Sequence, residues 1–137
     1  AALLQLGEGL NSYNRVILLG RLTRDPKLRY TMNGRSVLDL GMALNSSWKD
    51  KDGVVQEKAT FLDVTFWGRR AEALAKYLQK GDPLHVEAHL SREYWEDKDG
   101  KKQDKLRIVG ENFQFVASKK NREKRGYNKQ RAIPNGR

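Results

Sequence analysis

The chain has 137 residues and a formal net charge of +10, and most of that excess lies at one end. Residues 119–137 carry a net charge of +7, whereas residues 1–118 carry only +3. The absence of cysteine excludes disulfides, thiolate metal sites and cysteine nucleophiles. Since no apolar run reaches the length needed to cross a bilayer, we expect a soluble intracellular protein without a membrane partner.

Three segments are predicted from composition. Residues 1–10 are partly apolar but lack a basic leader, and we interpret them as a flexible lead-in. Residues 11–117 form the single folded domain expected for this length. Residues 118–137 are highly charged and nearly lack apolar side chains, so a disordered basic tail is predicted, because such a segment cannot bury enough surface to offset its chain entropy.

The first part of the domain predicts strands. The apolar run at residues 13–22 ends before Asp25-Pro26 and favours a strand buried on both faces. Residues 28–31 form a short extended piece before a turn at Asn33-Gly34. Apolar residues then alternate from Ser36 onward, as in a half-buried strand.

Residues 60–67 alternate again and predict the next strand. One of its faces carries Phe61, Asp63, Thr65 and Trp67. A core face would not hold a carboxylate there without a partner. This face is therefore a candidate functional surface.

The second part of the domain changes period. Apolar residues recur at helical spacing over residues 70–80 and predict a short amphipathic helix with Gly81 as its C-cap. Alternation returns over residues 84–90. Residues 105–115 predict a last strand with Leu106, Ile108 and Gly110 facing inward.

Two charged turns have nearly the same sequence. The chain reads WKDKDG over residues 48–53 and WEDKDG over residues 95–100. Asp-Gly between extended segments is a strong hairpin signal, because glycine readily takes the positive φ that the turn requires. Two long hairpin arms are predicted, each with an indole at its base.

The order of elements is strand, strand, strand, helix, strand, strand. It predicts an all-β protein with the OB-fold, a five-stranded Greek-key barrel with one short helix between the third and fourth strands. A β-sandwich with an incidental helix would give a similar order.

Motifs for catalysis or metal binding are incomplete. His85, Glu87 and His89 share one face of a strand, but no third zinc ligand of the required type is evident. A calcium-loop reading of the two turns fails, because the position that requires glutamate falls on Ala59 or Leu106. We expect no catalytic residue, no metal and no cofactor.

The stronger pattern consists of aromatic side chains beside cations on strands, which is typical of a surface where unpaired bases stack. The candidate stacking residues are Trp48, Phe61, Trp67 and Trp95. The candidate phosphate contacts are Arg15, Arg21, Arg29, Arg35, Lys49, Arg69 and Lys80. Core packing remains open for any strand aromatic, with Trp67 under the helix and Trp95 at a subunit contact as the alternatives.

Several segments resemble one known family. They read NRVILLGRL at 14–22, DPKLRY at 25–30, FWGR at 66–69, YLQKG at 77–81 and LHVEAHL at 84–90. Over residues 11–116 the chain resembles the bacterial and mitochondrial single-stranded DNA-binding proteins. The resemblance implies an OB-fold, commonly a homotetramer, that wraps single strands without sequence preference in replication, recombination and repair.

The resemblance also implies site residues. Trp48 and Trp95 match the family's aromatics at the starts of the two arms, whereas Phe61 and Trp67 stand where many members have Trp and Phe respectively. Basic positions of the family match Arg15, Arg29, Arg69 and Lys80. Glu93-Tyr94 departs from the pattern, since members often have basic residues there.

The carboxyl-terminal end departs further. Family members commonly end in an acidic tip that recruits replication and repair proteins, but residues 119–137 are basic. Truncation, a missing recruitment mode and a tail that contacts DNA all stay open.

The leading hypothesis is a non-enzymatic protein that binds and protects single-stranded DNA. It places the protein in the cytoplasm with the nucleoid, and an organelle stays open. The alternatives are an OB-fold nuclease built around Asp39 and Asp63, a protein-interaction scaffold, and an RNA-binding protein.

Overall fold

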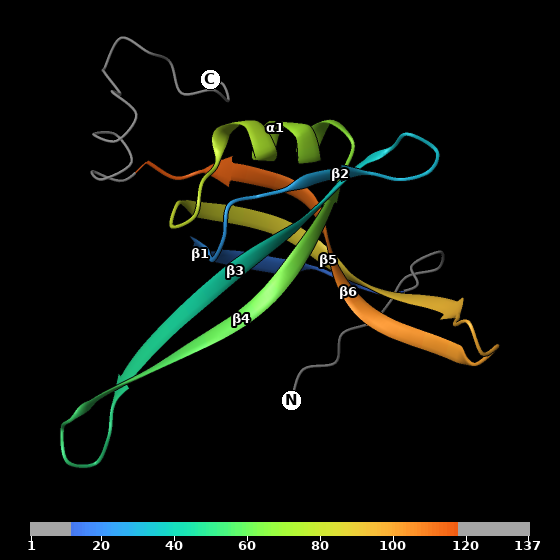
Figure 1. The fold of residues 1–137 in the computed structure, drawn as a ribbon. Coiled ribbons are helices and arrows are strands. Elements are labelled where there is room, and N and C mark those ends of the chain that lie inside the picture. The colour runs from blue at the N-terminus through green and yellow to red at the C-terminus, as the bar shows by residue number, and fades with distance from the viewer. Residues whose placement is uncertain (1–11, 118–137) are drawn as a thin grey trace, which may run out of the picture.

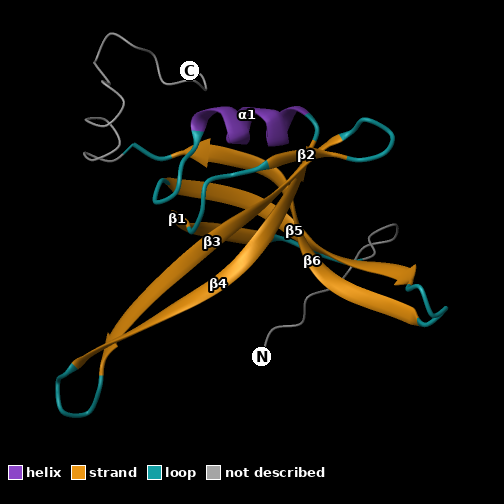
Figure 2. Ribbon diagram, in the orientation of Figure 1, coloured by secondary structure: helices purple, strands orange, loops and turns teal. Residues whose placement is uncertain are grey.

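The computed structural model describes residues 12–117, which form six strands and one helix (Figures 1 and 2). The elements are β1 (Val16–Leu22), β2 (Leu28–Tyr30), β3 (Ser36–Lys49), β4 (Val55–Trp67), α1 (Arg69–Tyr77), β5 (Pro83–Glu96) and β6 (Lys102–Phe115). The predictions of a flexible lead-in and a disordered tail lie outside the described residues. No helix of the described part is long and apolar enough to cross a membrane.

The strands close into a barrel. Their order is β1-β5-β6-β4-β3-β2, and a further pairing of β1 with β3 joins the two ends of the series. Neighbouring strands are antiparallel except β4 and β6, which run parallel and pair only at Val64↔Ile108 and Thr65↔Val109. When the three-residue β2 is left aside, five strands form the barrel and α1 lies between the third and fourth of them. The OB-fold prediction is confirmed.

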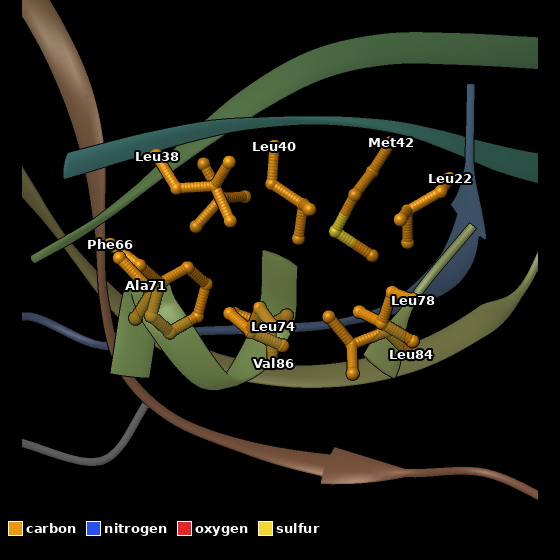
Figure 3. Close-up of a cluster of buried hydrophobic side chains, with 12 residues drawn as sticks. Leu22, Leu38, Leu40, Met42, Phe66, Ala71, Leu74, Leu78, Leu84 and Val86 are labelled. Carbon is orange, nitrogen blue, oxygen red and sulfur yellow. The ribbon is translucent and has the colours of Figure 1, made fainter. Parts of the chain in front are cut away.

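The barrel interior is apolar, and α1 closes one of its ends. Figure 3 shows Leu38, Leu40 and Met42 of β3 pointing toward the side chains of α1 and β5. Ala71 and Leu74 of α1 are fully buried in this cluster. Burying apolar surface here contributes the main favourable free energy of folding.

The helix is shorter than predicted. It ends at Tyr77, and its C-cap is Leu78 in extended conformation, so the prediction of Gly81 as the C-cap is wrong. Gly81, with φ of 91°, instead forms the turn into β5 and donates its N–H to the Leu22 carbonyl at 2.8 Å. Leu78 is 5% exposed, so the apolar pattern continues past the end of the helix.

The last strand, β6, contains a bulge and differs from the prediction in its inward-facing residues. The register passes from Glu87↔Asn112 to Ala88↔Gly110, which leaves Glu111 as an extra residue on β6. The bulge changes which side chains point inward, and Phe113 and Phe115 pack against the core. Leu106 is on the same face of β6 as Ile108 but lies farther out along the arm, where it is 51% exposed, so the prediction that it faces the barrel interior is wrong.

Two hairpins extend from the barrel as long arms. The β3–β4 pairing continues without a break to Lys49↔Val55, and the β5–β6 pairing continues to Glu96↔Lys102. The two arms diverge from each other below the barrel (Figure 1). Both predicted hairpins are therefore present, with the Asp-Gly turns at their ends.

Candidate nucleic-acid interface

We call residues 48–56 and 95–103 the two arm tips. Each begins with an exposed indole, because Trp48 is 49% exposed and Trp95 is 45% exposed. Across the hairpin, Trp48 pairs with Gln56 and Trp95 with Gln103. Two rings are thus available to a ligand.

An aspartate organises the turn in each tip. Asp50 Oδ1 accepts the N–H groups of Asp52 and Val54 at 2.9 and 3.0 Å, and its Oδ2 accepts the Gln56 amide at 3.0 Å. The Gln56 hydrogen bond, followed by those from Val54 and Asp52, holds the pKa of Asp50 below its usual value. Gly53 supplies the positive φ of 79° that completes the turn.

The second tip is built in the same way. Asp97 Oδ1 accepts from the N–H groups of Lys101 and Asp99, each at 2.9 Å, and its Oδ2 accepts from the Gln103 amide at 3.0 Å. These bonds, with that from Lys101 the largest, lower the pKa of Asp97 against the opposing effect of burial. Both turns are therefore locked by an ionised carboxylate at neutral pH.

The outer face of β4 carries the other two aromatic candidates. Phe61 is 70% exposed, whereas Trp67 is partly buried. The guanidinium of Arg35 lies 4.4 Å from the centroid of a Trp67 ring, a cation–π geometry. Trp67 therefore has a cation on one of its faces, and Phe61 is the more open ring.

The aromatic side chains of the β3–β4 hairpin lie on two different faces of the sheet. Side chains alternate along an unbroken strand, so Trp48 shares its face of β3 with the core residues Leu40 and Met42. Phe61 and Trp67 occupy the opposite face of the same hairpin. A ligand that contacts all of these rings must therefore pass around the arm.

Two carboxylates between Phe61 and Trp67 have arginine partners. Arg24 Nη2 donates to Asp63 Oδ1 at 3.2 Å, and Arg29 Nη2 donates to Asp39 Oδ2 at 2.8 Å. Arg24 crosses β3 above Gly41, where a Cβ would come within 2.3 Å of its guanidinium. Asp63 lies on the outer face of β4 and is largely exposed, so this face is not part of the core, as the sequence indicated.

Asp39 is the most strongly held of these groups. Burial alone would raise its pKa, but hydrogen bonds from Arg29 and Thr65 and the charges of Arg29 and Arg107 outweigh that effect. The pKa of Asp39 therefore lies below its usual value. The outer face therefore carries guanidinium groups and carboxylates that are paired with each other.

The predicted cations do not all lie together. Arg29 and Arg35 lie on the outer face with Trp67. Arg15 instead lies 3.8 Å from both Glu87 and Glu111 on the β5–β6 side of the barrel. Arg21 donates to the Gly81 carbonyl at 2.9 Å, in the turn that leads into β5.

Three further predicted cations sit at element ends. Arg69 opens α1, Lys80 lies in the α1–β5 connection, and Lys49 closes β3 beside Trp48. All three are exposed. The structure does not test the role of any predicted stacking or phosphate residue, and these assignments stay predictions.

Sequence reasoning missed two cations that face the same region. Lys105 and Arg107 of β6 line a cavity of about 200 Å³ where β6 separates from β4, opposite Leu62, Asp63 and Thr65. Arg107 Nε also donates to Glu93 at 2.6 Å. The alternation along β6 could have marked Arg107, but its neighbours on β4 are set by the barrel closure.

The paired histidines do not form a metal centre with a third ligand. His89 Nδ1 lies 2.8 Å from Glu111 Oε2 on β6. Within residues 12–117, no cluster of three or more His, Cys, Asp or Glu side chains could hold a metal ion.

The sequence matches the model of the single-strand binding protein family over residues 13–116. The chain belongs to this family. A single-stranded DNA-binding protein of Helicobacter hepaticus is 39% identical over 90% of this chain and 73% of its own length. One from Deinococcus radiodurans is 40% identical over 83% of this chain but only 38% of its own length, so the chain spans a variable part of its relatives.

Solved structures agree with the barrel. The wild-type single-stranded DNA-binding protein of Thermus aquaticus superposes with a TM-score of 0.67 at 32% identity, over 79% of this chain and 52% of that protein. A Plasmodium falciparum SSB in complex with single-stranded DNA superposes with a TM-score of 0.65 at 21% identity, over 80% of this chain and 99% of that one, and supports the fold. The family resemblance is confirmed.

Proposed function

We propose that this chain binds and protects single-stranded DNA without sequence preference, by stacking bases on exposed aromatics and pairing phosphates with Lys and Arg. The observation that carries this proposal is the pair of exposed indoles at the arm tips, together with the exposed Phe61. Aromatic faces accept every base, and cations along the path add an attraction that depends on salt. Related proteins with the same fold are named for this activity.

The rings at the arm tips give the direct test. Replacing Trp48 and Trp95 together by Ala should weaken binding to an oligothymidine by about 2–6 kcal/mol, since each stacked base contributes roughly 1–3 kcal/mol. Fluorescence anisotropy of a labelled oligonucleotide measures this loss. The matched control replaces both residues by Phe, which keeps a ring at each position and should retain most of the affinity.

Salt dependence separates stacking from charge. The slope of log affinity against log salt should become less negative by about 0.7 when one phosphate-contacting cation is replaced. It should stay the same in the Trp48 and Trp95 variants. Unchanged affinity in the double Ala variant with an intact barrel would refute the stacking assignment. Competition with an RNA oligonucleotide of the same length distinguishes DNA from RNA as the preferred ligand.

We further infer that the chain assembles into a homo-oligomer through β1, with the family's tetramer as the expected state. One edge of β1 pairs with β5, but within residues 12–117 no strand pairs with the other edge over Val16–Leu19. Ile17 and Leu19, which share the outer face of this strand, are each 62% exposed. Unpaired edges and exposed apolar residues favour association with another copy of the chain.

This activity places the protein where DNA becomes single-stranded, in the cytoplasm of a bacterial cell or within an organelle. Its expected roles are replication, recombination and repair. Recruitment of other proteins through the carboxyl-terminal tail falls on residues 118–137, outside the described part of the chain.

A further inference from the structure

The two arm tips contain the same set of hydrogen bonds. Besides the carboxylate bonds described above, the backbone N–H of Asp50 donates to the Val54 carbonyl and its carbonyl accepts from Gly53 N–H, at 3.0 Å each. In the second tip, Asp97 N–H donates to the Lys101 carbonyl at 2.9 Å, and the Asp97 carbonyl accepts from Gly100 N–H at 3.0 Å. Each tip thus contains five matching hydrogen bonds, and matching lengths differ by no more than 0.1 Å. The same device occurs twice in one chain.

The two tips are identical at most positions of their sequences. The tips differ at positions 49/96, 54/101 and 55/102, and they are identical elsewhere. Asp and Gly are sufficient to close such a turn. Gln56 and Gln103 lie beyond the turn, inside the strand, and add a hydrogen bond to the turn aspartate that a hairpin of this type does not require.

The glutamine has a fixed orientation. An ionised carboxylate only accepts hydrogen bonds, so Gln56 must present its amide nitrogen to Asp50 and Gln103 must do the same toward Asp97. Bonds with a charged partner are stronger than neutral ones. Each amide is therefore held in one position rather than free among rotamers.

The held amide stands beside the ring. Gln56 is the cross-strand partner of Trp48, and Gln103 is that of Trp95. Directly opposed residues on one face have Cβ atoms about 4.5–5.5 Å apart, within contact of a large ring. A glutamine fixed there would lie close enough to limit the rotation of the indole.

The charge of the tips points to the ring as their functional part. Residues 48–56 contain two lysines and two aspartates, and residues 95–103 contain three lysines and three acidic residues. Neither tip therefore attracts phosphate through net charge. What each tip presents to a nucleic acid is the exposed indole.

We propose that Gln56 and Gln103 are positioning residues that hold Trp48 and Trp95 ready to stack on nucleobases. The proposal rests on the proposed function, because it assigns these residues to the same binding site. An indole that is already ordered loses less freedom when a base stacks on it, and so binds more tightly.

The first test uses the protein without DNA. The full chain labelled with 5-fluorotryptophan gives one fluorine resonance for each of its three tryptophans. Gln56→Ala should shift and broaden only the Trp48 resonance, and Gln103→Ala only that of Trp95, while Trp67 reports that the barrel is intact. Gln79→Ala, in the α1–β5 connection, is the matched control. Unchanged resonances of Trp48 and Trp95 would overturn the proposal.

An isosteric variant separates position from volume. Gln56→Glu keeps the size of the side chain but cannot donate to Asp50 at pH 7, so the Trp48 resonance should change as in Gln56→Ala. In this variant two carboxyl groups face each other, and near pH 4.5 they can share one proton, which restores a hydrogen bond between positions 56 and 50. Recovery of the resonance supports the hydrogen bond as the cause, and a change that persists at pH 4.5 contradicts it.

DNA binding completes the test. Gln56→Ala and Gln103→Ala should each weaken oligothymidine binding roughly two- to tenfold, with the salt slope unchanged. Wild-type affinity in both variants would overturn the positioning role, provided that the double Ala variant of Trp48 and Trp95 does weaken binding. If that double variant also binds normally, the stacking proposal fails instead, and the fluorine spectra still decide whether the glutamines position the rings.

Discussion

Asp39 links three elements through one carboxylate. It accepts hydrogen bonds from Arg29 of β2 and Thr65 of β4, and Arg107 of β6 lies 3.9 Å away. Its lowered pKa means that the ionised form stabilises the fold. This contribution is complete above the pKa of the unfolded chain, near 3.8, and is lost as the pH falls through the lower folded value.

Asp39→Asn should therefore lower the free energy of unfolding by roughly 1–2 kcal/mol at pH 7, because bonds to a charged group are replaced by weaker ones. The difference from the wild type should shrink below pH 3.8 and vanish once Asp39 is protonated. Urea unfolding at pH values from 2.5 to 7 measures it. Asp104→Asn, which removes an exposed pair with Arg92, is the control with an expected effect below 1 kcal/mol. Equal effects of the two variants at pH 7 would contradict this assignment.

At the scale of residues, the sequence predicted the face on which a side chain lies better than the residue with which it pairs. Alternation placed Asp63 beside two aromatics and indicated that this face of β4 is not part of the core. The partner, Arg24, lies 39 positions earlier in the chain and reaches Asp63 only because Gly41 leaves room above β3. Such pairs depend on strand order and register, which local patterns do not contain.

Next to the bulge in the β5–β6 ladder, β6 passes close to the barrel core. Gly110 lies against the ring of Phe66, and a Cβ at this position would come within 2.3 Å of two ring carbons. Phe66 is fully buried, so its ring has little room to move. The barrel can pass β6 this close to the core only without a side chain at position 110.

Gly110→Ala should destabilise the fold by about 1–3 kcal/mol through overpacking. Thermal and urea unfolding measure the loss. Asn112→Ala, at an exposed position of the same strand, provides the comparison and should change stability by less than about 0.5 kcal/mol. Wild-type stability of Gly110→Ala would show that the Phe66 ring relocates without cost.

At the scale of elements, the positions of the regular strands were predictable, but the prediction that β1 is buried on both faces is wrong, because Ile17 and Leu19 are each 62% exposed. Period-two alternation located β3, β4 and β5, and the Asp-Gly signal located both turns. The inserted Glu111 changes the phase of β6, so alternation read from Leu106 onward does not predict that Phe113 and Phe115 pack against the core. The hydrogen bond between each turn aspartate and its glutamine could not be predicted from the sequence either, because it depends on which residue lies opposite each Trp.

At the scale of the whole molecule, the prediction concerns the assembly of several copies of the chain through β1. Replacing Ile17 and Leu19 together by Asp places charges on the exposed outer face of this strand. The variant should sediment as a smaller species than the wild type, with an intact barrel by circular dichroism. The control, Val54→Asp and Val55→Asp at the first arm tip, should leave the assembly unchanged. A variant of Ile17 and Leu19 that sediments like the wild type would exclude this surface as the interface.

The placement of Trp48 and Phe61 on opposite sides of one hairpin has a consequence for ligand length. An oligonucleotide of a few nucleotides can lie along one side only and leaves the other ring in water. A longer one can turn over the edge of the hairpin and use both. The free energy gained per added nucleotide should therefore rise in a step at the length that first makes this turn, rather than grow evenly.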